Sequence, residues 1–140
     1  MLEQLPQLDK APEQKEDLTS ANILVVEDDD SWTHILHEGF SMVEFNAIFA
    51  STVQDGLRLL NKHKFDVVVT DLGLPGGSGV DIAREAKRLN KDTSVILFSG
   101  SMADPVVQKL VHDEPIDAIV PKEAGLFRLI DGIRVHLNHF

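Results

Sequence analysis

The chain has 140 residues, of which 43 % are hydrophobic, and this suits one domain with a single core. It contains no cysteine, which excludes a disulfide framework and a thiolate zinc site, and its net charge of −10 makes it a poor binder of nucleic acid. No apolar run approaches the ~20 residues that a membrane-spanning helix needs, so we expect a cytoplasmic protein with no membrane partner.

The first twenty residues differ in composition from the rest of the chain. They are rich in Gln, Glu, Lys and Pro, and they lack the basic start and apolar stretch of a secretory signal. Five acids against two bases give this segment a charge of −3, which leaves 18 acids and 11 bases, or −7, for the remainder. We therefore expect a flexible N-terminal extension over 1–20 and a folded domain over 21–140.

From Ala21 onward, short apolar runs alternate with amphipathic stretches. The runs predict five strands, over 23–26, 47–50, 67–70, 95–98 and 118–120. The stretches predict five helices: over 31–42, after a cap at Ser51 or Thr52, from Val80 to Leu89, after a cap at Asp104 with Pro105 at the first position, and over 126–137. The glycines between 73 and 79 predict a loop. Five successive βα units predict an α/β fold with a doubly wound parallel sheet.

Apolar residues at helical spacing predict which side of each helix faces the core. The first helix has Trp32, Ile35, Leu36 and Phe40 as inner positions, and the third helix includes Leu89. The inner face of the short fourth helix is expected to consist of Val106, Val107, Leu110 and Val111.

Four of the predicted strands end in residue types that phosphoryl chemistry uses. Glu27 and Asp28 follow the first strand, Asp71 the third, Ser99 the fourth and Lys122 the fifth. Because the carboxyl ends of parallel strands share one edge of the sheet, where ligands bind, we expect these side chains to meet. This set of residues predicts a magnesium-dependent aspartyl-phosphate site.

The acidic run over 27–30 has two interpretations. Carboxylates of Glu27, Asp28 and Asp71 that lie close together repel one another unless a cation or protons compensate, and Mg²⁺ prefers such hard oxygen ligands. Alternatively, the run places acids at a helix N-terminus, where the macrodipole favours them. The presence of Asp71 and Lys122 in the same arrangement favours the metal site.

Four segments carry a resemblance to a known family: ILVVEDDD, VVVTDLGLPGGSG, VILFSGS and DAIVPKEA. In this order, each at a strand end, they resemble the receiver domain of bacterial two-component response regulators over about 23–137. The resemblance implies a flavodoxin-like (βα)5 fold with strand order 2-1-3-4-5. It also implies a phosphorylation-controlled switch rather than an enzyme.

Carried over by position, the resemblance implies a role for each site residue. Asp71 is expected to accept a phosphoryl group from a histidine kinase or a histidine phosphotransfer protein. Ser99 is expected to bond that group, and Lys122 is expected to pair with one of its oxygens. The expected Mg²⁺ ligands are Glu27, Asp28, Asp71 and the backbone carbonyl of Gly73.

Two positions depart from the family pattern. Members usually carry a proline directly after the lysine, whereas here Pro121 precedes Lys122. Three residues before the lysine, where Tyr or Phe is common, this chain has Ile119, so no aromatic ring can rotate there. We therefore expect the loop after the last strand to differ, and the switch to work through Ser99 and the packing of the fourth helix.

The expected output is binding of an output protein, or of a second copy of the domain, through the fourth helix, fifth strand and fifth helix. Residues 101–114 are expected to shift on activation. A receiver-like scaffold or phosphate sink without such an output is the alternative. An α/β phosphohydrolase of the haloacid dehalogenase type is less favoured, because it needs a second acid two residues past its nucleophile, where Gly73 stands.

Overall fold

The computed structural model describes residues 22–100 and 103–137, with the exception of the side chain of Leu110. The extension expected over 1–20 lies outside the described residues. So does the inner position expected for Leu110.

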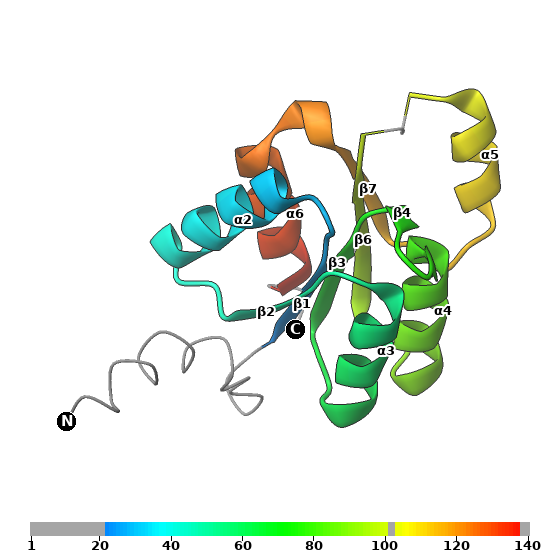
Figure 1. Cartoon of the computed structure of the whole chain (residues 1–140), viewed down its shortest axis with the longest axis horizontal. Helices are drawn as coiled ribbons and strands as arrows, with labels where there is room; N and C mark the ends of the chain where they lie inside the picture. Colours follow the sequence, from blue (N-terminus) through cyan, green and yellow to red (C-terminus); the bar gives the residue numbers. More distant parts are fainter. Residues whose placement is uncertain (1–21, 101–102, 138–140) are drawn as a thin grey trace.

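The five strands of the main sheet run parallel in the order β2-β1-β3-β6-β7 (Figure 1). Their bounds are β1 (Ile23–Val26), β2 (Ala47–Ala50), β3 (Val67–Thr70), β6 (Ser94–Ser99) and β7 (Ala118–Pro121). Counted along the chain, this is the order 2-1-3-4-5, so the predicted α/β fold and strand order are confirmed.

Helices cover both faces of this sheet (Figure 1). They are α2 (Asp30–Met42), α3 (Val53–Lys62), α4 (Gly79–Leu89), α5 (Pro105–His112) and α6 (Leu126–Leu137), with a 3₁₀ turn η1 (Lys122–Ala124). Helices α2 and α6 pack on one face, and α3 and α4 pack on the other. Every residue of β1 and β3 is therefore buried, which explains why these strands are continuous apolar runs rather than alternating ones.

Helices α3 and α5 begin at the predicted caps. The side chain of Thr52 accepts a hydrogen bond of 3.1 Å from the amide of Asp55 at the start of α3. The carboxylate of Asp104 accepts one of 2.9 Å from the amide of Val106, with Pro105 at the first position of α5. Each cap satisfies an amide that would otherwise lack a partner in the first helical turn.

The predicted loop over 73–79 contains a small antiparallel hairpin. Its strands are β4 (Gly73–Leu74) and β5 (Gly77–Ser78). Gly76 turns the chain with a φ of 89°, a conformation that favours glycine. Ser78 then forms a capping box with Asp81 at the start of α4. The predicted loop therefore contains a short paired segment, which the glycine content did not indicate.

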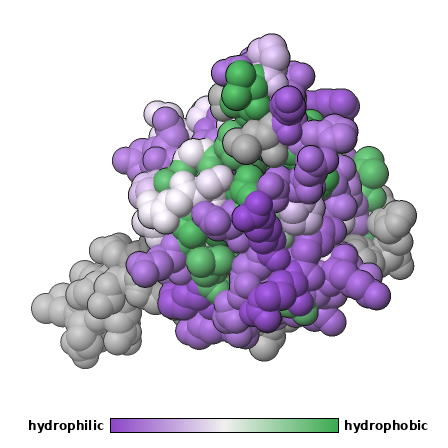
Figure 2. Space-filling view, turned by 90° about the vertical axis from the view of Figure 1, so that its right-hand side faces the viewer, coloured by the Kyte–Doolittle hydropathy of each residue, from purple (hydrophilic) through white to green (hydrophobic). Residues whose placement is uncertain are grey.

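Three apolar residues predicted to face the core are exposed instead. Ile35 is 40 % exposed, Leu89 is 41 % exposed and Val106 is 74 % exposed. Helix α5 buries Val111 against Leu97 in a small cluster, beside the edge strand β7. A helix beside the edge of a sheet covers less of the sheet, so α5 buries fewer of its apolar side chains. The spacing of apolar residues in the sequence does not show where the sheet ends. Figure 2, which faces the side that carries α4 and α5, shows hydrophobic side chains at the surface among hydrophilic ones.

Candidate functional site

Glu27 and Asp71 stand next to each other because the hydrogen-bond ladder continues one residue past β1 and β3. Val26 pairs with Thr70 at the ends of these strands. The amide of Asp71 then donates to the carbonyl of Val26 at 3.1 Å, and the amide of Glu27 donates to the carbonyl of Ala50 in β2 at 2.9 Å. The backbone therefore holds both acids at the carboxyl edge of the sheet, where the sequence predicted them.

Lys122 bridges the two acids. Its Nζ atom lies 2.9 Å from Oε1 of Glu27 and 2.8 Å from Oδ2 of Asp71. The three side chains are largely shielded from water, with exposed fractions of 13 % for Lys122, 2 % for Glu27 and 14 % for Asp71. Charge-assisted hydrogen bonds shielded in this way are stronger than those at the surface.

Pro121 ends β7, and Lys122 begins the 3₁₀ turn η1 that follows directly. The expected difference between this loop and that of the family stays a prediction. The ammonium group of Lys122 reaches both acids in spite of the proline that precedes it.

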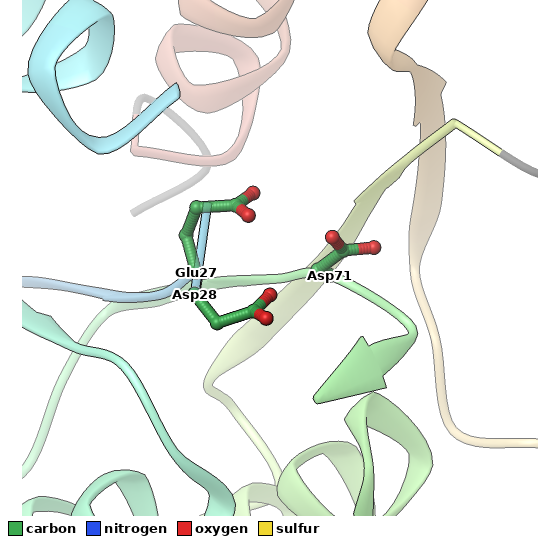
Figure 3. A group of neighbouring side chains, drawn as sticks. All are labelled: Glu27, Asp28 and Asp71. Atoms are coloured by element: carbon green, nitrogen blue, oxygen red, sulfur yellow. The ribbon is translucent and has the colours of Figure 1, made fainter. Parts of the chain in front are cut away.

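A third carboxylate joins this edge. One oxygen each of Glu27, Asp28 and Asp71 lie within 4.8 Å of one another. Figure 3 shows that Glu27 and Asp28 extend their carboxylates toward the side on which Asp71 stands. Glu27 is buried, Asp71 is partly buried and Asp28 is exposed. The group therefore offers oxygen ligands on a surface that water still reaches.

Burial sets the proton affinity of Glu27. Loss of hydration raises the pKa of Glu27 above its usual value, although hydrogen bonds from Lys122 and from the amide of Asp29 act in the opposite direction. Burial would lower the pKa of Lys122, but its hydrogen bonds to Asp71 and Glu27 outweigh this effect and raise it. Lys122 is therefore protonated at neutral pH, and its ammonium group supplies a positive charge at this site.

The acidic run over 27–30 divides between the two interpretations given for it. Asp29 caps α2 by accepting a hydrogen bond of 2.9 Å from the amide of Trp32, and Asp30 lies in the first helical turn. Glu27 and Asp28 face Asp71 instead. Both interpretations are therefore correct for part of the run. Asp29 and Asp30 belong to the N-terminus of α2, and Glu27 and Asp28 belong to the carboxylate group.

Two aromatic rings lie beside Lys122, and the sequence did not predict this arrangement. The Nζ atom of Lys122 lies 5.8 Å from the ring centre of Trp32 and 6.0 Å from that of Phe98. The two rings meet edge to face with 5.0 Å between their centres. Their negative faces attract a cation, so they help to hold the ammonium group in place. In the sequence, only the position of Trp32 about one helical turn after the acids indicated that its ring could lie near the site.

Gly79 packs against the backbone of Asp71. A Cβ atom at this position would overlap the carbonyl oxygen of Asp71 and would crowd the hydroxyl of Thr70. The amide of Gly79 also donates to the carbonyl of Leu72 at 2.7 Å. The glycine was expected only as part of a loop, but its missing side chain lets α4 approach the residue that follows β3.

Ser99 and Gly73 belong to the same edge of the sheet. Ser99 is the last residue of β6, is 3 % exposed and pairs with Pro121, the neighbour of Lys122. Gly73 is exposed and opens the hairpin two residues after Asp71. The phosphoryl contact expected for Ser99 and the Mg²⁺ contact expected for the Gly73 carbonyl stay predictions.

Comparison with known proteins agrees with this fold. A family model described as the response regulator receiver domain matches residues 23–134. The transcriptional regulatory protein AfsQ1 of Streptomyces coelicolor is 30 % identical over 108 residues, which cover 69 % of this chain and 48 % of that protein. The KDP operon transcriptional regulatory protein KdpE of Escherichia coli is 28 % identical over 117 residues, which cover 84 % of this chain and 51 % of that protein.

Solved structures of the same kind superpose closely. The BeF3-activated DrrB receiver domain has a TM-score of 0.72 and 28 % identity, with 83 % of this chain and 96 % of that chain covered. A CheY-like receiver domain protein from Methanospirillum hungatei has a TM-score of 0.77 and 21 % identity, with 85 % of this chain and 94 % of that chain covered.

The chain belongs to the response regulator receiver domain family of two-component systems. Receiver domains of this family interact with histidine kinases and with output domains. The chain spans about half the length of the curated regulatory proteins that it matches. Within the described residues, none of the helices combines the length and the apolar character that crossing a membrane requires.

Proposed function

We propose that this chain is a phosphorylation-controlled switch in which Asp71 accepts a phosphoryl group. The observation that carries the proposal is the ammonium group of Lys122, hydrogen-bonded to Asp71 at 2.8 Å beside a group of three carboxylates. A cation held at the acceptor carboxylate stabilises the negative charge that a phosphoryl group brings. We assign residues 21–140 to the receiver domain and 1–20 to an extension, and we place the protein in the cytoplasm.

The donor is a phosphohistidine of a histidine kinase or a histidine phosphotransfer protein. A carboxylate oxygen of Asp71 attacks the phosphorus, an O–P bond forms, and the N–P bond to the imidazole breaks. The imidazole keeps the electron pair of that bond and takes a proton from solvent. Asp71 is fixed for this attack because Oδ1 accepts the amide of Leu72 at 2.6 Å while Oδ2 accepts Lys122. Positioning of this kind is the main contribution of the protein to phosphoryl transfer.

The carboxylate group fits a magnesium ion. With Glu27 ionised, three carboxylates and one ammonium group leave a formal charge of −2, which a divalent cation neutralises. Carboxylate oxygens on a surface open to water suit an ion that keeps several of its own waters. Glu27, Asp28, Asp71 and the Gly73 carbonyl would hold Mg²⁺, which when bound supplies positive charge to the phosphoryl oxygens.

The phosphoryl group adds negative charge and acceptor oxygens at the sheet edge. Ser99 and Lys122 are the groups that respond to it, since a hydroxyl donates a hydrogen bond and the ammonium pairs with an oxygen. They lie at the ends of β6 and β7, the strands on either side of the segment that contains α5. The output is binding of an output protein, or of a second copy, through α5, β7 and α6.

Beryllofluoride, a mimic of the phosphoryl group, tests this function. Added with Mg²⁺ to the full chain, it is expected to shift the amide resonances of Asp71, Ser99 and Lys122. Fluoride with Mg²⁺ but without beryllium is the control, and Asp71→Asn is expected to abolish the response. Shifts that persist in the Asn variant would contradict the proposal.

A receiver without a phosphorylation-driven output is the second candidate. Ile119, at the position where relatives commonly carry an aromatic switch residue, is 44 % exposed and has no ring to rotate. Hydrogen exchange with and without beryllofluoride distinguishes the two candidates. A switch changes protection over residues 103–114, which include α5. A phosphate sink or scaffold changes protection only around Asp71.

A further inference from the structure

A pocket opens at the edge of the sheet opposite to Asp71, where the strands begin. It has a volume of about 290 Å³ and lies between the C-terminal ends of α3 and α4. Leu60, Phe65, Ala86 and Leu89 provide its apolar lining. Leu89 is 41 % exposed although it belongs to the amphipathic helix α4, so part of this lining faces water. The pocket leaves apolar surface that a further chain segment can cover.

The charged side chains of this pocket are all basic. Lys62 and Lys64 line it, and none of its lining residues is an acid. Within 22–100 and 103–137, neither lysine forms an ion pair. The helix macrodipole stabilises the positive charge of Lys62 at the C-terminal end of α3. Lys64 lies beyond the helix, so the macrodipole does not explain its position. A basic pocket on a chain with a net charge of −10 attracts an acidic occupant.

The N-terminal segment joins the domain at this same edge. Asn22 precedes β1, and its backbone oxygen accepts hydrogen bonds from the amides of Asp66 at 2.9 Å and Val67 at 3.1 Å, close to Lys64 and Phe65 in sequence. Its side-chain Oδ1 atom is buried and has no hydrogen-bond partner among the described residues. A buried acceptor without a partner costs about 1–3 kcal/mol, so a donor from the chain that enters here would stabilise the domain.

We propose that residues 1–20 dock in this pocket. The segment has five acids and two bases, for a charge of −3, and its leucines are Leu2, Leu5, Leu8 and Leu18. A leucine side chain fills the apolar lining while neighbouring acids face Lys62 and Lys64. Twenty extended residues reach up to about 70 Å, so length does not limit the contact.

The docked segment covers the edge of the sheet that lies away from Asp71. It therefore protects the apolar ends of α3 and α4 without blocking access to the phosphorylation site. Because the contact includes exposed charges, it weakens at high salt.

Paramagnetic relaxation in the full chain tests this inference. The chain has no cysteine, so Gln7→Cys provides one site for a nitroxide label. The label is expected to broaden amide resonances over 60–65 and 86–93 and to spare those around Asp71. The double variant Lys62→Glu, Lys64→Glu is expected to lose this broadening. The matched variant Lys109→Glu, Arg128→Glu, which changes the net charge equally on other helices, is expected to keep it.

A charge reversal in the segment completes the test. Glu3→Lys with Asp9→Lys is expected to restore the broadening in the Lys62→Glu, Lys64→Glu background, and the amide spectrum of that background verifies that it folds. Absence of selective broadening over 60–65 and 86–93 would overturn the inference and leave the pocket to another protein. Broadening on an isotope-labelled chain mixed with a separate nitroxide-labelled chain would overturn it in favour of a second copy.

Discussion

The ammonium nitrogen of Lys122 lies 2.8 Å from Oδ2 of Asp71, although 51 residues separate them in the sequence. The same nitrogen compensates Glu27, whose side chain is only 2 % exposed. Lys122 is therefore part of the balance of charge inside the folded domain as well as a candidate partner of the phosphoryl group. Substitution of Lys122 is therefore expected to change the stability of the domain as well as its response to phosphorylation.

Lys122→Met is expected to lower the free energy of unfolding by about 3–5 kcal/mol at neutral pH without metal, because it leaves the carboxylate of Glu27 buried without a counter-charge. Urea unfolding monitored by circular dichroism measures this change. The matched variant Lys91→Met removes an exposed lysine outside the site and is expected to stay within about 0.5 kcal/mol of the wild type.

The pH dependence of this deficit follows from Glu27. Burial already raises the pKa of Glu27 above its usual 4.5, and loss of the hydrogen bond from Lys122 raises it further. A raised folded-state pKa favours folding fully below the unfolded pKa, and this contribution is lost as the pH rises through the folded pKa. The deficit of Lys122→Met is thus expected to shrink as the pH falls from neutral toward 4.5. An equal deficit at both ends of this window would show that Glu27 is not its source.

Trp32 offers a direct probe of metal binding. It is the only tryptophan of the chain, and its ring centre lies 5.8 Å from Nζ of Lys122. Titration with Mg²⁺ is expected to change its fluorescence to a plateau, and Asp28→Asn is expected to weaken the apparent affinity about tenfold or more, because one of three charged ligands is lost. Asp30→Asn, in the first turn of α2, is the matched control and is expected to titrate like the wild type. Identical titrations of all three proteins would place the ion elsewhere.

Gly79→Ala tests whether α4 must approach Asp71 closely. The added Cβ atom would overlap the Asp71 carbonyl oxygen, so helix and loop have to separate. We expect a loss of about 1–3 kcal/mol of unfolding free energy and a slower rate of phosphorylation. Gly132→Ala in α6 is the control, since its nearest neighbour would be 3.7 Å away, and it is expected to gain up to about 1 kcal/mol from helix propensity. An unchanged phosphorylation rate and an unchanged free energy of unfolding in Gly79→Ala would show that α4 does not need to approach Asp71 closely.

The sequence predicts the fold well because this fold has a strong local signal. Strands covered on both faces appear as continuous apolar runs, and both 23–26 and 67–70 match the observed strands residue for residue. The site follows from the same property, because a polar residue directly after such a run must stand at the carboxyl edge. Glu27, Asp71 and Lys122 were therefore predictable without any knowledge of distances.

Other features depend on contacts that a linear pattern does not contain. Val106 was predicted to face the core together with Val111, but the two residues are five apart and therefore lie on different sides of α5. Only Val111 is buried, because the edge of the sheet limits what α5 can cover. The rings of Trp32 and Phe98 meet beside Lys122 although their positions suggest only core packing. Gly79 was indistinguishable from the other loop glycines until the carbonyl of Asp71 was located.

The most direct test of the central claim is the location of the phosphoryl group. After incubation of the full chain with acetyl phosphate and Mg²⁺, mass spectrometry of the intact protein and of its peptides measures how many groups are added and where. We expect one group in the wild type, on the peptide that contains Asp71, and one in Asp66→Asn, which alters an exposed aspartate just before β3. We expect none in Asp71→Asn. Equal labelling of Asp71→Asn and the wild type would contradict the account.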